Sequence, residues 1–583
     1  MSIAEEAERR RRLVTRTLPI TVLGVGAFFA GIIFGAGSEL EAVERFAAAW
    51  TRGDYEAMHA ELTPEAQNDI PIEEFIAAYE EAAAAATIAE IEAGETEEGS
   101  VDGEEAGVVP VTARTRAWGD IEGEISVSVT DGLVAWEPHL VFPGLTAGES
   151  LGRQTRAPAR APILAADGTP LAEGPAAARS SPIGLAASDV TGAVDTARGE
   201  TDAELQAQGF PPRSLTGDTG LELAFNDRLD GQPGGRLVAL AEGTDDPATG
   251  RELAVSEPVP GKPVETTLDP DLQEAAVLAL GDLFGGVAVL DAEDGSVKAL
   301  AGIAFSAPQP PGSTFKVITT SAALEKGLVK PADAFPVETA AVIEGREVAN
   351  AHDEACGGTF SQSFAKSCNS VFAPLGVEVG AEGLVAEAEA YGFNSPPSLY
   401  DTDALEAVKP AESTIPSAGE IGGDLDVGVS AIGQGEVLAT PLQLASIAQT
   451  VAAGGTRSPT PIAKDPELAP DAKPVEVMSP ETAKTLTELM IGVVTEGTGS
   501  AAALDGIQVA GKTGTAELGA KALEPGQELA PGEEPEQEVD AWFTAFAPAS
   551  APKLAVAAMV VNADGDGGTI AAPIVAQVLD AGL

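Results

Sequence analysis

Residues 311–316 read Pro-Gly-Ser-Thr-Phe-Lys, and the interpretation of the second half of the chain starts from them. The proline–glycine pair ends whatever element precedes it, so we predict a helix over 313–326. Ser313 would then lie in the first turn, where free backbone N–H groups and the helix dipole favour developing negative charge. Lys316 shares a face with Ser313. If burial or a second cation lowers its pKa, a neutral Lys316 can take the serine proton.

The Ser-x-x-Lys pattern is short enough to arise by chance, and the chain holds a second copy at Ser363–Lys366. That serine has no proline–glycine break before it, so we expect it to be a structural residue within a helix. A Ser–Lys pair needs no histidine. We interpret the three histidines, His59, His139 and His352, as surface or packing residues.

Ser367-Cys368-Asn369 is the second motif with side chains suited to this chemistry. It places a hydroxyl and an amide two positions apart, which suits proton transfer and the binding of a substrate amide. A solvated loop would have the same sequence, so the motif alone leaves both interpretations open.

The third motif, Gly-Lys-Thr-Gly-Thr at residues 511–515, follows an apolar stretch and is predicted to form a strand. Gly514 lets another backbone approach closely, and Thr513 and Thr515 present hydroxyls on one face. Lys512 would provide a fixed cation for a substrate carboxylate and would lower the pKa of Lys316. The alternative is an exposed lysine at a strand turn.

Taken in order, Ser313-x-x-Lys316, Ser367-x-Asn369 and Lys512-Thr513-Gly514 resemble the three motifs of penicillin-binding proteins and serine β-lactamases. Residues 265–583 carry this resemblance, and their longer strings are similar to those of class B penicillin-binding proteins. These strings are 311–316, 511–517, Gly433-Gln434-Gly435, 440–443 and Trp542-Phe543. Upstream, residues 146–264 resemble the dimerisation domain of that family. Residues 38–145 resemble its nuclear-transport-factor-like domain.

This resemblance implies a peptidoglycan D,D-transpeptidase. Ser313 would attack the D-Ala–D-Ala carbonyl of a stem peptide with Lys316 as base. The N–H groups of Ser313 and Thr515 would hold the oxyanion. Ser367 would pass a proton to the departing nitrogen, and Asn369 would orient the stem amide.

The resemblance also implies how substrate is held and released. Lys512, Thr513 and Thr515 would bind the terminal carboxylate, with Gly514 between them on the substrate-binding strand. An amine from a neighbouring stem would resolve the acyl-enzyme and form the cross-link. A β-lactam would acylate Ser313 as a substrate mimic.

Several rival functions stay open. A class A β-lactamase is disfavoured, because its deacylating glutamate lies in an E-x-x-x-N pattern between the second and third motifs. Here the only asparagine in that interval, Asn394, is preceded at four residues by Ala390. A D,D-carboxypeptidase differs from a transpeptidase only in using water instead of an amine. A non-catalytic scaffold that binds wall polymer or division partners is the non-enzymatic alternative.

The hydrophobic pattern predicts a multidomain chain. Residues 39–95 read as helices, 95–105 as an exposed acidic turn, and 108–136 as three strands of a small α+β domain. Residues 146–264, rich in glycine and proline, read as a β-rich pedestal, with a strand at 163–165 entering a tight turn. From 265 onward we predict one α/β domain. Its elements would be a helix at 269–283, strands at 287–290, 297–300, 542–547 and 554–561, and a last helix at 573–579.

The N-terminus predicts a membrane anchor. Five arginines precede an uncharged apolar stretch at 18–37, and twenty residues at about 1.5 Å each reach roughly 30 Å, enough to cross a bilayer once. The basic tail, 1–17, would stay in the cytosol and place the catalytic domain outside. A cleaved signal peptide is the main alternative.

The net charge and the cysteine content limit the ligands and partners that the chain can bind. Lys and Arg total 33 against 91 Asp and Glu, and a net charge of -58 disfavours nucleic-acid binding. Two cysteines and three histidines leave little material for a metal site, and we expect no cofactor. Outside the cell Cys356 and Cys368 could pair in a disulfide worth about 3 kcal/mol, with two free thiols as the alternative. A separate glycan polymerase is a candidate partner.

The acidity itself generates a prediction about salt. Exposed carboxylates repel one another over a Debye length of about 10 Å at 0.1 M salt and about 3 Å at 1 M. We therefore expect 1 M KCl to raise the melting temperature by roughly 5 °C, measured against a sucrose control of equal osmolality. An unchanged melting temperature would mean that the acidity reflects composition and solubility alone.

Overall fold

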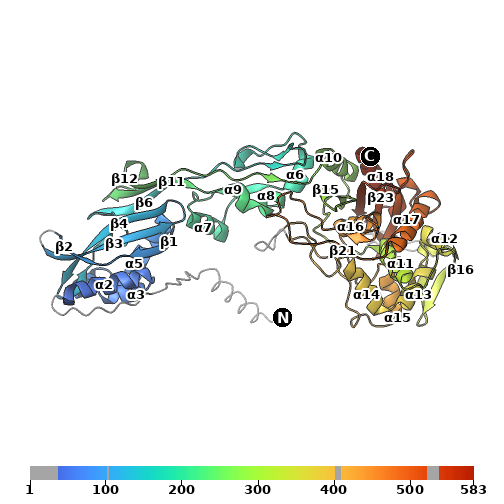
Figure 1. The fold of residues 1–583 in the computed structure, drawn as a ribbon, viewed down its shortest axis with the longest axis horizontal. Coiled ribbons are helices and arrows are strands. Elements are labelled where there is room, and N and C mark those ends of the chain that lie inside the picture. Colours follow the sequence, from blue (N-terminus) through green and yellow to red (C-terminus); the bar gives the residue numbers. More distant parts are fainter. Residues whose placement is uncertain (1–36, 102–103, 401–408, 521–536) are drawn as a thin grey trace, which may run out of the picture. The chain divides into compact units, whose positions relative to one another are not determined.

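The computed structural model describes residues 37–101, 104–400, 409–520 and 537–583 (Figure 1). The chain forms two compact units. Among the described residues, the first comprises those from 37 to 160 together with 196–215 and 230–261. The second comprises 161–195, 216–229 and 262–583. The pedestal stretch predicted at 146–264 therefore contributes residues to both units.

The first unit begins with helices packed on an antiparallel sheet. The helices are α2 (Gly37–Thr51), α3 (Tyr55–Ala60), α4 (Pro64–Asp69) and α5 (Ile72–Ala86). The strands are β1 (Ile88–Ala93), β2 (Glu97–Val101), β3 (Glu104–Thr115), β4 (Gly119–Thr130) and β5 (Leu133–Ala135), in the order β1-β3-β4-β5 with β2 beside β3. Aromatic side chains of α2 and α5 fill the core with β-branched residues of β3 and β4.

The structure corrects two expectations in this region. Residues 88–93 form strand β1 and not helix, and residues 97–101 form strand β2 and not an exposed turn; both strands pair with β3. Helix α5 ends at Ala86, and the next residue, Thr87, takes a left-handed φ of 51°. Because that conformation is unfavourable for a β-branched residue, the sequence carries no ordinary stop signal here.

The first unit continues with a sheet from the pedestal stretch. Its strands are β6 (Glu149–Arg156), β11 (Gly234–Ala241) and β12 (Arg251–Ser256), in the order β12-β11-β6 and antiparallel throughout. Helix α7 (Gly199–Gln208) belongs to the same unit.

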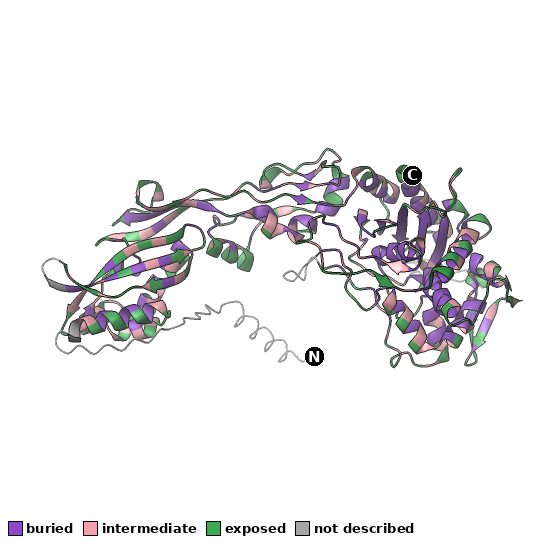
Figure 2. Ribbon diagram, viewed as in Figure 1, coloured by how far each residue is buried: buried purple, intermediate pink, exposed green. Residues whose placement is uncertain are grey.

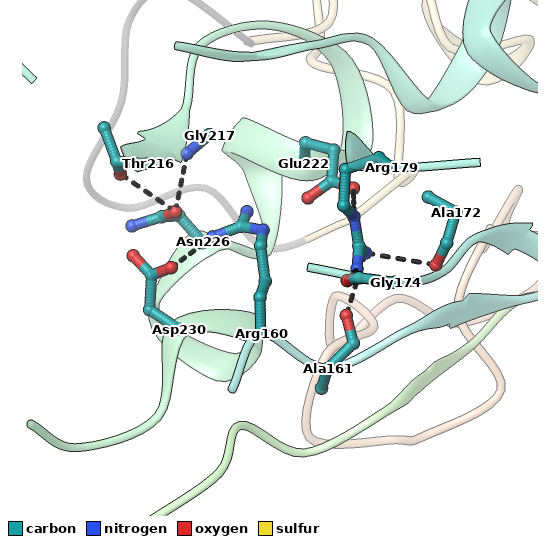
Figure 3. Close-up of polar contacts among 10 residues, drawn as sticks. All are labelled: Arg160, Ala161, Ala172, Gly174, Arg179, Thr216, Gly217, Glu222, Asn226 and Asp230. Carbon is teal, nitrogen blue, oxygen red and sulfur yellow. Dashed lines mark hydrogen bonds and ion pairs between the residues drawn. The ribbon is translucent and has the colours of Figure 1, made fainter. Parts of the chain in front are cut away.

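The second unit begins with a small sheet of β7 (Ile163–Leu164), β8 (Pro170–Ala172) and β13 (Val264–Glu265). The strand and tight turn predicted near 163–168 are confirmed, with Gly168 at a φ of 89°. Helices α6 (Leu185–Thr191) and α8 (Gly220–Ala224) follow. Figure 3 shows that the Arg179 side chain links several segments of this region by hydrogen bonds. It donates to Glu222 at 2.7 Å and to the carbonyls of Ala161, Ala172 and Gly174 at 2.8–3.1 Å.

The rest of the second unit is built on a five-stranded antiparallel sheet in the order β15-β14-β24-β23-β22. Its strands are β14 (Gly285–Asp291), β15 (Val297–Gly302), β22 (Ala510–Ala520), β23 (Gln537–Ala547) and β24 (Leu554–Val560). The predicted strands from both ends of the domain are thus confirmed as neighbours in one sheet. Helix α10 (Pro270–Leu280) begins one residue later and ends three residues earlier than predicted, and α18 (Ala572–Gly582) is the last helix.

Both faces of this sheet are buried, as Figure 2 shows. Val287 and Val289 pack with α10 and α18 on one face, whereas Ala288 and Leu290 face the helices of the middle segment. These helices are α11 (Lys316–Glu325), α12 (Phe360–Ala365), α13 (Asn369–Val379), α14 (Ala381–Ala390), α15 (Asp424–Ala431), α16 (Pro441–Ala452) and α17 (Pro480–Thr495). Burial on both faces fixes strand β22, at the edge of the sheet, against this helical layer.

The predicted anchor lies outside this description. Residues 1–36, which hold the basic tail and all but the last residue of the stretch 18–37, are not among the described residues. Within the described part of the chain, none of the helices has the length and apolar character to span a bilayer.

A half-buried carboxyl behind α11 makes the fold sensitive to pH. Glu387 on α14 accepts a hydrogen bond from Ser321 of α11 at 2.5 Å, and burial raises the pKa of Glu387 to about 7. Because this pKa is raised above its unfolded value, stability is lost as pH rises from about 4.5 to 7. We expect Glu387→Gln to stabilise the fold by about 2 kcal/mol at pH 8.5 and by almost nothing at pH 5.

Denaturant unfolding at both pH values measures this difference. Glu378→Gln, an exposed carboxyl on the neighbouring helix α13, is the matched control and should change little. An equal effect of Glu387→Gln at pH 5 and pH 8.5 would contradict the assignment.

Candidate active site

Ser313 lies at the start of the helical layer, in the first turn, as predicted, although the turn is tighter than an α-helix. Gly312–Phe315 form a 3₁₀ turn, η4, that leads directly into α11. Ser313 is half-buried, whereas Phe315 and Lys316 are fully buried. The serine therefore remains accessible on a turn whose neighbours are fixed in the core.

Glycines hold this turn against strand β22. A Cβ at Gly312, whose φ is 52°, would lie 2.6 Å from the carbonyl oxygen of Thr515, and a Cβ at Gly514 would lie 2.6 Å from that of Pro311. The Gly312 N–H donates to Gly433 at 2.9 Å, and a Cβ at Gly433 would clash with Gly312. Close backbone contact at these positions requires residues without side chains.

Lys316 is fully buried and donates three hydrogen bonds to the second motif. They run to the carbonyl oxygen of Ser367 at 2.7 Å, to its hydroxyl at 3.2 Å and to Asn369 Oδ1 at 2.6 Å. Among the described residues it makes none to the Ser313 hydroxyl, and such bonds often tighten only when substrate binds. Burial, followed by the charge of Lys512, lowers the pKa of Lys316 well below its usual value.

Lys512 approaches the same hydroxyl from β22. It is fully buried, and its Nζ donates to Ser367 Oγ at 2.9 Å and to the carbonyl oxygen of Thr513 at 3.1 Å. Burial lowers the pKa of Lys512 to about 7. The two amines also lie over aromatic rings, Lys316 over Phe372 at 5.3 Å and Lys512 over Phe364 at 5.7 Å. One serine hydroxyl thus joins two buried lysines from separate elements.

Ser367 reaches this position through the end of helix α12. Its φ is 63°, and the N–H groups of Ser367 and Cys368 bond back to Phe364 at 3.1 Å and Ser363 at 2.9 Å. This is the Schellman geometry, in which the left-handed position usually holds glycine. A serine there costs about 1 kcal/mol of backbone strain, which marks the side chain as the reason for its presence.

Two further sequence features lie at this turn. Cys356 of β19 (Cys356–Thr359) and Cys368 form a disulfide with their Cα atoms 5.4 Å apart. The second Ser-x-x-Lys copy behaves as expected. Ser363 is fully buried within α12, and its hydroxyl donates to the carbonyl of Thr359 at 3.0 Å.

The threonines of β22 have partners that the sequence did not reveal. Thr513 Oγ1 lies 2.6 Å from the hydroxyl of Thr498, and Thr515 Oγ1 accepts the N–H of Gly567 at 3.3 Å. Gln434 donates to the carbonyl of Thr515 at 3.5 Å, which joins the Gly-Gln-Gly segment to the site. The glycines on either side of Thr498 are the only local sequence feature that suggests a special position, and they do not show that Thr498 contacts Thr513.

The site combines an accessible serine on a helical turn, an edge strand packed against that turn, and two buried lysines that share the hydroxyl of a second serine. This is the arrangement of a serine acyl-transfer enzyme. Family models agree with this class. Residues 285–580 match the penicillin-binding protein transpeptidase domain, 172–266 the penicillin-binding protein dimerisation domain, and 38–149 the NTF2-like N-terminal transpeptidase domain. The chain belongs to the penicillin-binding protein transpeptidases.

Named relatives agree with this assignment. Peptidoglycan D,D-transpeptidase PbpA of Mycobacterium tuberculosis is 36% identical over 375 residues, which cover 60% of this chain and 67% of the relative. PbpA of Mycolicibacterium smegmatis is also 36% identical, with the same coverage over 379 residues. The ceftriaxone acyl-enzyme of penicillin-binding protein A from M. tuberculosis superposes with a TM-score of 0.55 at 29% identity. The superposition covers 73% of this chain and 98% of the M. tuberculosis chain.

The strained turn at Ser367 gives a prediction that separates function from stability. Ser367→Ala and Ser367→Gly both remove the hydroxyl that joins Lys316 to Lys512, so we expect acylation by a β-lactam to fall at least about 100-fold in both. Glycine accepts the left-handed φ, so the glycine variant should be about 1 kcal/mol more stable than the alanine variant. Denaturant unfolding and stopped-flow acylation measure the two effects. Equal stability of the variants would show that the turn is unstrained.

Proposed function

We propose that this chain is a peptidoglycan D,D-transpeptidase that works through a Ser313 acyl-enzyme. The observation that supports it most strongly is the convergence of Lys316 and Lys512 on the Ser367 hydroxyl, at 3.2 and 2.9 Å. Two ammonium groups in one buried site repel each other, so one of them is held neutral at physiological pH. A neutral amine next to a nucleophilic serine is a general base.

Acylation then uses the first two motifs. Lys316 takes the proton of Ser313 as its oxygen attacks the D-Ala–D-Ala carbonyl of a stem peptide. The backbone N–H groups of Ser313 and Thr515 hold the oxyanion, each worth about 3 kcal/mol in comparable sites. Ser367 passes a proton to the departing D-Ala nitrogen, and Asn369 orients the stem amide.

Substrate binding uses the edge strand. The charged form of Lys512, with Thr513 and Thr515, holds the terminal carboxylate. Gly514 keeps the strand close to the serine turn, where a Cβ would meet Pro311. An amine of a second stem peptide resolves the acyl-enzyme and forms the cross-link. A β-lactam acylates Ser313 as a substrate mimic.

The domain plan belongs to the same proposal. Residues 1–17 form a cytosolic tail, 18–37 a single-pass anchor, 38–145 the NTF2-like domain, 146–264 the pedestal and 265–583 the transpeptidase domain. Matches at 38–149, 172–266 and 285–580 support the last three. The anchor places catalysis outside the membrane, where stem peptides are cross-linked, and a separate glycan polymerase supplies the strands.

Labelling by a fluorescent penicillin tests the nucleophile. We expect Ser313→Ala to abolish labelling, because no other residue carries the acyl group. Ser363→Ala, in the second Ser-x-x-Lys copy, is the matched control and should label like the parent protein. Labelling that survives Ser313→Ala, or that depends on Ser363, would contradict the proposal.

Product analysis separates the enzymatic alternatives. The full chain is incubated with a D-Ala–D-Ala stem peptide and an amine acceptor, and the products are weighed by mass spectrometry. A transpeptidase forms the cross-linked amide in increasing share as the acceptor concentration rises. Release of free carboxylate alone would identify a D,D-carboxypeptidase. Absence of turnover would favour the non-catalytic scaffold that binds wall polymer or division partners.

A further inference from the structure

Thr498 lies where the elements of the active site meet, although no motif includes it. It follows α17 and is exposed, and its hydroxyl lies 2.6 Å from that of Thr513, which is only 6% exposed. This contact joins the loop after α17 to the strand that carries Lys512. Thr498 is thus the accessible member of a hydroxyl pair whose other member is buried on β22.

The backbone of Thr498 is fixed on both sides. Its N–H donates to the carbonyl of Ala365 at 3.2 Å, two residues before the strained Ser367. A Cβ at Gly568 would lie 2.3 Å from the Thr498 carbonyl oxygen, and the adjacent Gly567 donates to Thr515 Oγ1 at 3.3 Å. The Thr498 hydroxyl is therefore held in a defined place next to Thr513.

The direction of this hydrogen bond decides what Thr513 can do. A threonine hydroxyl has a single hydrogen, and a carboxylate only accepts hydrogen bonds. If Thr513 donated to Thr498, its hydrogen would be unavailable to a substrate carboxylate. If Thr498 donates, Thr513 accepts and its own hydrogen is free, and a hydroxyl that accepts a bond becomes a stronger donor.

We propose that Thr498 is a positioning residue for carboxylate recognition: it donates to Thr513 and thereby directs the Thr513 hydrogen to the carboxylate of a stem peptide or β-lactam. This inference rests on the proposed function. Thr498 acts only through Thr513, so its effect depends on the carboxylate of the ligand. A purely structural role would affect ligands with and without that group equally.

The test compares benzylpenicillin with its methyl ester, which lacks the negative charge. Acylation rates of the full chain are measured for Thr498→Val, which has the same shape without a donor, and for Thr498→Ser, which keeps the hydroxyl. We expect Thr498→Val to slow acylation by the acid about tenfold and to leave the slower acylation by the ester unchanged. Thr498→Ser should restore most of the rate with the acid.

A double variant shows whether the effect passes through Thr513. Thr498→Val should add nothing to Thr513→Val in the combined variant, because both remove the same interaction. Equal losses for acid and ester, or additive losses in the double variant, would overturn the inference while leaving the proposed function intact. A parent protein that benzylpenicillin fails to acylate would instead overturn the proposed function.

Discussion

The site depends on one constraint: two lysine side chains, both fully buried, share a single serine hydroxyl. Removing an ammonium group from water costs several kcal/mol, and a second positive charge at hydrogen-bonding distance of the same oxygen adds to that cost. The protein relieves it by lowering both pKa values, that of Lys512 to about 7 and that of Lys316 well below 10.5. An amine that loses its proton far more readily than an ordinary lysine is the direct consequence.

Much of the surrounding structure serves to hold this unfavourable arrangement. The three contributing elements are the serine turn, the turn after α12 and the edge strand β22. They lie far apart in the sequence and meet only in the folded chain. Glycines allow the first and third to meet at backbone distance, and burial of both faces of the sheet fixes the strand. The turn after α12 is strained at Ser367, and the Cys356–Cys368 disulfide links it to strand β19. The free energy of folding thus maintains a site that would relax if its parts were free.

The sequence predicted which motif side chains converge better than it predicted parts of the fold. Short motifs predicted that Lys316, Ser367 and Lys512 act together, and the structure brings these three side chains to hydrogen-bonding distance. They could not show that Ser367 takes a left-handed φ or that Thr498 contacts Thr513, since both are set by tertiary packing. In the first unit, the helical spacing of apolar residues over 39–95 predicted helix for residues 88–93. Pairing with β3, which follows after β2, makes them a strand.

Nuclear magnetic resonance of ¹³Cε-labelled lysine tests the central claim most directly, with signals assigned by Lys316→Arg and Lys512→Arg. The account predicts that the Lys512 signal titrates near pH 7 and that Lys316 titrates far below pH 10.5, whereas the exposed lysines titrate near 10.5. Titration of both site lysines near 10.5 would contradict it, because neither amine would then be neutral where the enzyme works.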